Sequence, residues 1–72
     1  MNGLFRRSIM HKEKIMIVYI DHHDKLTQRI IQVLRIHHHS ILAYCYYRKH
    51  VRQFKLANIL SAGSIRHMKR GA

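Results

Sequence analysis

Aromatic and cationic side chains are interleaved in one short stretch, ILAYCYYRKHVRQFKL, which covers residues 41–56. Tyrosine rings can stack on unpaired bases, while arginine and lysine attract phosphate groups, and proteins that bind single strands combine these two interactions. The stretch therefore predicts a binding surface for single-stranded nucleic acid or a nucleotide-like anion. The residues of the stretch that we expect to form it are Tyr44, Tyr46, Arg48, Arg52 and Lys55.

The overall charge supports the same class of ligand. The chain has 14 Lys and Arg against only Glu13, Asp21 and Asp24, which gives a formal net charge of +11 with histidine neutral. Such a field attracts polyanions. For each single residue a purely structural role stays open as the alternative to ligand binding, because tyrosines also cover small hydrophobic cores and cations also keep a surface soluble.

Metal binding and catalysis are poorly supported by the remaining polar residues. Two histidine runs, His22-His23 and residues 37–39, could ligate zinc, but adjacent histidines in a strand or tight turn are expected to point apart. Three carboxylates leave little for acid–base chemistry, and Cys45 is predicted to be buried and unreactive. We expect no metal site, no cofactor and no enzymatic activity.

The length and the apolar runs limit the architecture. A chain of 72 residues supports a single thin core, so we expect one domain. The longest wholly apolar run, Ile15–Ile20, is far shorter than the roughly 20 residues that span a bilayer. The lone cysteine can form no internal disulfide, so the chain is expected to be cytoplasmic. Residues 4–12 form only a short helix with one modest apolar side, so no membrane partner is expected.

Local patterns predict a mostly β fold with a short N-terminal helix. Asn2 can cap a helix over residues 3–12, and β-branched runs bounded by polar turns favour strands. The expected inward side of this helix carries Leu4, Phe5, Ser8 and Ile9. The apolar residues of the second strand do not alternate cleanly, so periodicity alone leaves a helix open there. The expected strands cover residues 14–21, 26–37, 41–47 and 52–56, and residues 59–65 add a short fifth element.

The third and fourth strands are expected to form a hairpin with a four-residue loop, residues 48–51, that pairs Tyr47 with Arg52. Because successive side chains of a strand point to opposite sides, this hairpin has two faces. The predicted core face carries Ile41, Ala43, Cys45, Tyr47, Phe54 and Leu56, with Arg52 near the loop. The predicted binding face carries Leu42, Tyr44, Tyr46, Gln53 and Lys55.

Two segments resemble a known family. The segment AYCYYRKHVRQFKLANI, residues 43–59, is similar to the end of the WYL domain of bacterial regulators. In that domain a strand that ends in Ala-Tyr-Cys is followed by an Arg, a turn and a second Arg. The next strand then has a pattern like Arg-Phe-basic-Leu. RSIMHKEKIMIVY, residues 7–19, resembles the opening helix and first strand of that domain. The positions that match are Tyr19, Tyr44, Arg48, Arg52, Phe54 and Lys55.

The resemblance implies a small SH3-like or Sm-like β-barrel over residues 1–65, followed by a basic C-terminal tail, residues 66–72, which we expect to be mobile. It also implies a ligand-sensing, regulatory module, and it adds Tyr19 to the expected binding residues. At the family's Trp-Tyr-Leu positions this chain has His39, Ser40 and Ile41, and Asn58 replaces a usual basic residue.

A protein-binding role is the alternative function. Fewer than fifteen residues precede the first strand, so the family's helix-turn-helix is not expected within this sequence, and the chain is not expected to act as a complete repressor by itself. A small barrel could instead use its edge strands to form a homo-oligomer or to dock on a DNA-binding regulator that carries a helix-turn-helix.

Overall fold

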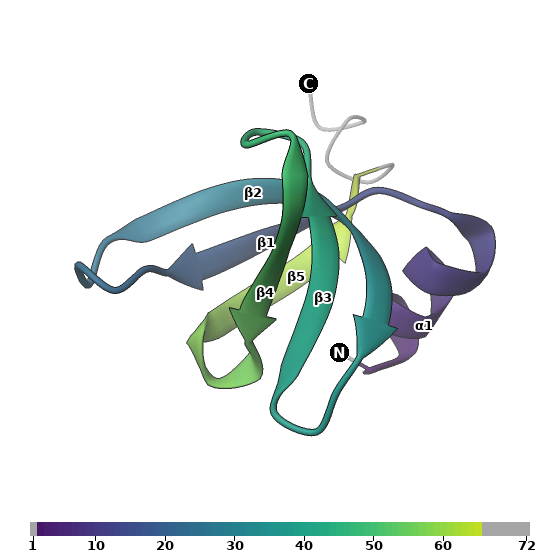
Figure 1. Cartoon of the computed structure of the whole chain (residues 1–72), viewed down its shortest axis with the longest axis horizontal. Helices are drawn as coiled ribbons and strands as arrows, with labels where there is room; N and C mark the ends of the chain where they lie inside the picture. Colours follow the sequence, from purple (N-terminus) through teal and green to yellow (C-terminus); the bar gives the residue numbers. More distant parts are fainter. Residues whose placement is uncertain (1, 66–72) are drawn as a thin grey trace.

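The computed structural model of the chain describes residues 2–65, which form a helix followed by a five-stranded sheet (Figure 1). Every element that the sequence predicts is present, so the mostly β class is confirmed. The segment over residues 26–37, for which periodicity left a helix open, is a strand. The elements are α1 (Asn2–His11), β1 (Ile15–Ile20), β2 (Leu26–Ile36), β3 (Ser40–Cys45), β4 (His50–Lys55), the 3₁₀ turn η1 (Leu56–Asn58) and β5 (Ile59–Ser64).

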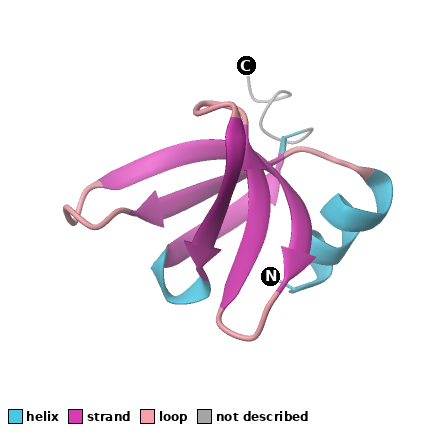
Figure 2. Ribbon diagram, viewed as in Figure 1, coloured by secondary structure: helices cyan, strands magenta, loops and turns pink. Residues whose placement is uncertain are grey.

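All strand pairs are antiparallel, in the order β4-β3-β2-β1-β5. The sheet is strongly bent, so that β3 and β4 run across β1 and β5 (Figure 2). The expected closed barrel is not found among the described residues, because β4 and β5 are the two edges of the sheet. After β4 the chain passes through η1 and then pairs with β1 rather than with β4.

A bulge bends the long strand β2. The register against β3 shifts between Val33 and Arg35, and such a bulge twists and redirects a strand. It also interrupts the alternation of buried and exposed residues, since the neighbours Leu34 and Arg35 are both exposed.

One buried hydroxyl fixes the helix on this bulge. The Ser8 Oγ accepts a hydrogen bond from the Val33 N–H at 2.9 Å and donates one to the Glu13 carbonyl at 2.6 Å. The Val33 N–H, which the bulge takes out of the regular ladder, thereby keeps a partner. The C-terminal end of α1, the linker to β1 and the middle of β2 are consequently held together.

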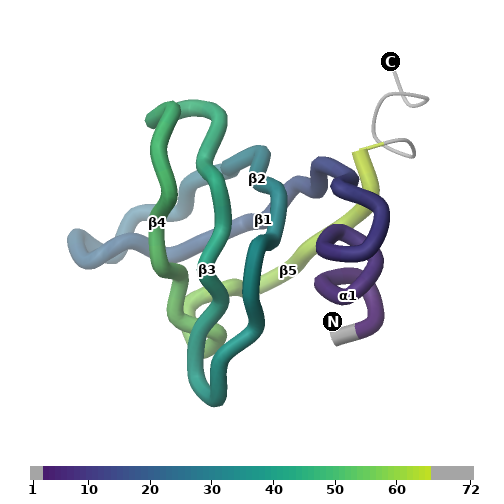
Figure 3. Tube along the Cα trace, turned by 45° about the vertical axis from the view of Figure 1, so that its right-hand side comes forward, coloured from purple at the N-terminus to yellow at the C-terminus, as the bar shows by residue number. Residues whose placement is uncertain are grey.

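The core lies inside the bend and is covered at one end by α1 (Figure 3). The predicted inward side of the helix is confirmed, since Phe5 and Ser8 are fully buried, and Leu4 and Ile9 pack against the core. The buried apolar residues are Phe5, Ile15, Ile17, Ile31, Val33, Ile41, Ala43, Cys45, Phe54 and Ile59.

The predicted register of the β3–β4 hairpin is wrong, although its faces are right. The turn has four residues, as expected, but it covers residues 46–49, so Arg52 pairs with Ala43 and not with Tyr47. A displacement by an even number of residues keeps every side chain on its face. Cys45 is therefore buried as predicted, while Tyr47, expected in the core, is in the turn and 71% exposed.

None of the helices in residues 2–65 is long and apolar enough to span a membrane. The predicted basic tail, residues 66–72, lies outside the described part of the chain.

Candidate functional site

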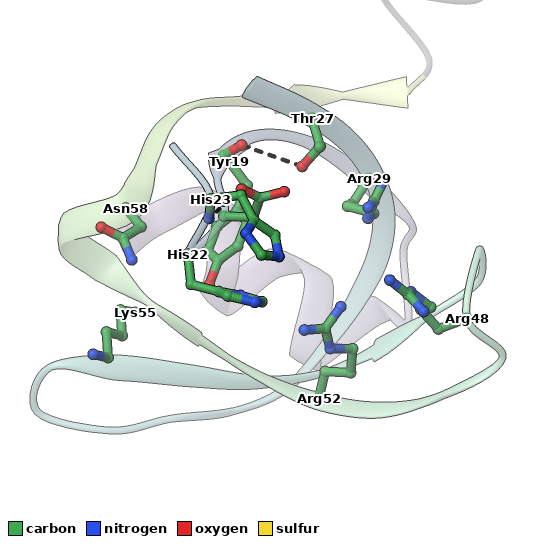
Figure 4. A pocket seen from close by; sticks show the side chains of 10 residues that line it. Tyr19, His22, His23, Thr27, Arg29, Arg48, Arg52, Lys55 and Asn58 are labelled. Carbon is green, nitrogen blue, oxygen red and sulfur yellow. Dashed lines mark hydrogen bonds between the residues drawn. The ribbon is translucent and has the colours of Figure 1, made fainter. Parts of the chain in front are cut away.

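A cavity of about 240 Å³ opens at the end of the bent sheet, with α1 behind it (Figure 4). We call this cavity the mouth. It lies between the β1–β2 hairpin on one side and β4 with η1 on the other. Its lining residues are Tyr19, Asp21, His22, His23, Thr27, Arg29, Arg48, Arg52, Lys55 and Asn58.

The mouth forms where the inward-facing rows of the strands run past the apolar core. On β1 the buried Ile17 is followed two residues later by Tyr19, and on β2 the buried Ile31 is preceded by Arg29. On β4 the buried Phe54 is likewise preceded by Arg52. Because alternate residues share a face, the same alternation that builds the core directs these polar side chains into the mouth.

Positive charge is concentrated around this cavity. Arg29, Arg48, Arg52 and Lys55 line it together with two histidines, against the single carboxylate of Asp21. Within residues 2–65 the one ion pair joins Arg7 to Glu13 at 3.7 Å, and neither residue lines the mouth. The mouth cations thus repel one another without a carboxylate partner, an arrangement that a bound anion would stabilise.

Tyr19 has a fixed position behind the two histidines (Figure 4). Its ring meets the buried Phe54 ring edge to face, with centroids 5.0 Å apart and planes at 88°. The Thr27 hydroxyl donates a hydrogen bond of 3.2 Å to the Tyr19 carbonyl. Tyr19 lines the mouth, and within the described residues its hydroxyl has no hydrogen-bond partner, so the hydroxyl is free to bond a ligand.

The tip of the β1–β2 hairpin is organised by Asp21. One carboxylate oxygen accepts hydrogen bonds from the backbone N–H groups of His23, at 2.8 Å, and Lys25, at 3.0 Å. The hydrogen bond from the Lys25 N–H is the main reason that the pKa of Asp21 lies below its ordinary value. Desolvation opposes this effect, and the His23 N–H and the charges of the two nearby histidines add to the lowering. Asp24 takes up the left-handed conformation that closes the turn, with φ of 61°.

The histidines do not point apart as the sequence suggested. The His22 and His23 rings lie 4.1 Å apart between centroids, and those of His38 and His39 lie 4.6 Å apart. Both pairs lie in the bends that connect strands, and the expectation that adjacent histidines point apart there is wrong. Even so, residues 2–65 contain no group of three or more histidine, cysteine or carboxylate side chains that could hold a metal ion.

The structure divides the six residues predicted to bind a ligand. Tyr19, Arg48, Arg52 and Lys55 line the mouth, whereas Tyr44 and Tyr46 do not. These two tyrosines form an edge-to-face pair, 4.9 Å between centroids, on the half-buried outer side of the sheet. The Tyr46 hydroxyl donates to the Gln32 side-chain oxygen at 3.3 Å, and the Lys14 ammonium lies 4.5 Å from the Tyr46 ring centroid.

Several lining residues were not predicted from the sequence. Arg29, Thr27 and the His22-His23 pair come from β2 and the hairpin that precedes it, far along the chain from the aromatic stretch. Arg29 had a local signal, since it is two residues before Ile31 and hence on the inward face. Asn58, noted in the sequence only as a departure from the family pattern, also lines the mouth.

Comparison with known proteins gives a likeness of fold. No protein-family model matches the sequence, and no curated protein matches it. The fold is similar to part of a solved structure of proteasome accessory factor B/C (PafBC) of Arthrobacter aurescens, with a TM-score of 0.77 and 22% sequence identity. The match covers 88% of this chain and 11% of that chain. The chain thus has the fold of a segment of that larger protein.

Proposed function

We propose that this chain is a non-enzymatic, WYL-like regulatory module that binds single-stranded nucleic acid or a nucleotide-like anion at the mouth. The observation that carries the proposal is the group of four cations around Tyr19 with Asp21 as the single lining carboxylate. The family assignment is supported by the motifs at residues 7–19 and 43–59 and by a fold similar to part of PafBC.

The proposed binding mode divides the affinity between charge and stacking. Arg48, Arg52 and Lys55 attract a phosphate group, and neutralising them relieves their mutual repulsion. Tyr19, fixed by Phe54, offers a ring to one unpaired base. Single strands are favoured over duplex, because the bases of a duplex are already stacked on one another and are not free to enter a cavity of about 240 Å³.

Absence of catalysis is part of the same proposal. The Asp21 carboxylate already accepts two backbone hydrogen bonds within its own turn, which leaves it poorly placed as a general base. Cys45 is fully buried and does not line the mouth, where a nucleophile would be needed. The cations and the aromatic ring are binding groups, and the proposed role is therefore recognition of a ligand.

A second candidate function rests on the open sheet. The edges β4 and β5 each present backbone groups that are not paired in the sheet, and each carries an exposed apolar side chain, Val51 at 47% and Leu60 at 51%. Edge strands with these properties can pair with another chain. The partner would be a second copy of this chain or a regulator that carries a helix-turn-helix.

Fluorescence anisotropy with labelled single-stranded and duplex oligonucleotides, measured across a salt series, tests the proposal. We expect the single strand to bind more tightly, with affinity that falls steeply as salt rises. Binding that is absent at low salt would refute the proposal. Association that depends only weakly on salt would favour the protein-binding candidate instead.

A matched pair of variants separates the mouth from general positive charge. Arg48→Ala with Arg52→Ala removes two cations that line the mouth, and Arg6→Ala with Arg35→Ala removes two exposed cations that do not. The first double variant should lose most of the affinity, and the slope of the logarithm of affinity against the logarithm of salt concentration should become shallower by about two units. The second should stay close to the unmodified chain, and equal losses in both would mean that the mouth is not the binding site.

A further inference from the structure

Tyr47 differs from the other tyrosines of the chain. It lies in the β3–β4 turn with 71% of its area exposed, whereas Tyr19, Tyr44 and Tyr46 are half-buried. An aromatic side chain this exposed adds little to the core, and Tyr47 is not among the residues that line the mouth.

Two arginines connect Tyr47 to the mouth. The Arg29 guanidinium carbon lies 4.7 Å from the Tyr47 ring centroid, and that of Arg48 lies 5.9 Å from it. Both arginines line the mouth, and Figure 4 draws both on its right-hand side. The exposed ring, two guanidinium groups and the cavity therefore follow one another across the surface.

We propose that Tyr47 is a second stacking position, so that the ligand is a single strand of at least two nucleotides. One base lies in the mouth against Tyr19, the next stacks on Tyr47, and Arg29 and Arg48 contact the phosphate that links them. This inference rests on the proposed function, because it extends the same site outward and specifies the length of the ligand.

Two features of the free protein favour this arrangement. The two guanidinium groups cover only part of the Tyr47 ring, since 71% of the residue's area is exposed, which leaves ring surface for a base. The contact with Arg29 also restricts the ring before binding, which lowers the entropy lost when a base stacks on it. A stacking partner next to a cationic cavity is what a single strand requires and what an isolated phosphate does not use.

The test is a titration of the isotope-labelled chain, followed by nuclear magnetic resonance, with thymidine monophosphate and with the 5′-phosphorylated thymidine dinucleotide. In Tyr47→Leu we expect the Kd for the dinucleotide to rise by at least about fivefold, the lower end of what loss of one base–aromatic stack produces. The Kd for the mononucleotide should not change. Tyr47→Phe, which keeps the ring, should bind both probes as the unmodified chain does.

Tyr44→Leu is the matched control, because it removes a tyrosine ring from the outer side of the sheet, away from the mouth. It should leave both dissociation constants unchanged. A dinucleotide that binds Tyr47→Leu as well as the unmodified chain, or a mononucleotide that is weakened equally, would overturn the second stacking position while leaving the mouth intact. If the unmodified chain binds neither probe nor longer thymidine oligonucleotides, the proposed function fails and this inference fails with it.

Discussion

Two clusters of the same residue types occupy different parts of the sheet. At the mouth, Tyr19 is surrounded by cations that have no carboxylate partner within the described residues. On the outer side, Tyr44 and Tyr46 pack against each other, with the Lys14 ammonium over the second ring and a hydrogen bond to Gln32. The tyrosines of the outer cluster thus interact with one another and with neighbouring side chains, whereas the mouth cations contact aromatic rings but form no ion pair within the described residues.

The difference shows that composition along the chain does not identify a binding site. Tyr44 and Tyr46 are close to Arg48 in sequence, but they do not line the mouth. Tyr19 is far from Arg52 in sequence, but both belong to inward rows that continue past the core. A cation beside a tyrosine is a binding feature only when both face a cavity.

Cys45 gives the largest expected contrast, because it lies between Tyr44 and Tyr46 on the chain but faces the opposite way, into the core. A thiol reagent should label it at least about 100-fold more slowly in the native chain than in the urea-unfolded chain, since labelling requires opening of the sheet. The colour released by a disulfide reagent measures both rates. Equal rates would place Cys45 on an accessible surface and would invalidate the assignment of the two faces.

The tyrosines of the two clusters should differ in their effect on binding. Tyr19→Leu should weaken binding of a thymidine oligonucleotide by about 1–3 kcal/mol through loss of one stacked base. Tyr44→Leu should have no measurable effect on affinity, although it loses packing against Tyr46. Anisotropy, at a temperature where circular dichroism shows both variants folded, makes the comparison. Loss of affinity in Tyr44→Leu alone would move the site to the outer side.

The lysines of the two clusters provide a comparison of charge. Lys55→Ala removes a cation that lines the mouth and should lower the salt slope by about one unit. Lys14→Ala removes the ammonium above the Tyr46 ring and should leave the slope almost unchanged. The slope of the logarithm of affinity against the logarithm of salt concentration is the measurement. Identical slopes in the two variants would indicate that the ligand responds to net charge only.

Replacement of Asp21 should produce the smallest effect, and it should strengthen anion binding while it weakens the fold at neutral pH. Asp21→Asn removes the carboxylate of the mouth, so anion affinity should rise. The folded pKa of Asp21 is lowered, so its ionised form stabilises the fold above the unfolded pKa, and that contribution is lost as the pH falls through the folded pKa. Thermal unfolding below about pH 4 should therefore depend less on pH in the variant. Weaker anion binding at neutral pH would contradict the assignment.

Much of the fold could be predicted because it depends on local patterns. The β-branched runs predict the strands, and the apolar side of residues 3–12 predicts how α1 packs. The faces of β3 and β4 were right even though the pairing was not, because the error in register was even. The bulge in β2 was missed, since it depends on the Ser8 hydroxyl satisfying the Val33 N–H from another element.

The binding surface was only partly predictable. Arg48, Arg52 and Lys55 were identified because cations near tyrosines suggest nucleic acid, and they do line the mouth. Arg29 and the His22-His23 pair come from a different hairpin, and no pattern within one strand brings them next to β4. Tyr47 was assigned to the core, because the turn was placed two residues too late.

The sequence by itself determined the strong positive charge, the strands and the side of the sheet to which each alternate residue belongs. These properties follow from side-chain type and from the two-residue period of a strand, which require no knowledge of distant partners. Only the tertiary structure decided that the sheet remains open and that Tyr19 and four cations surround one cavity. The bend that brings the β1–β2 hairpin toward β4 arises from a bulge and from packing around a shared core, and both depend on contacts between residues far apart in the chain.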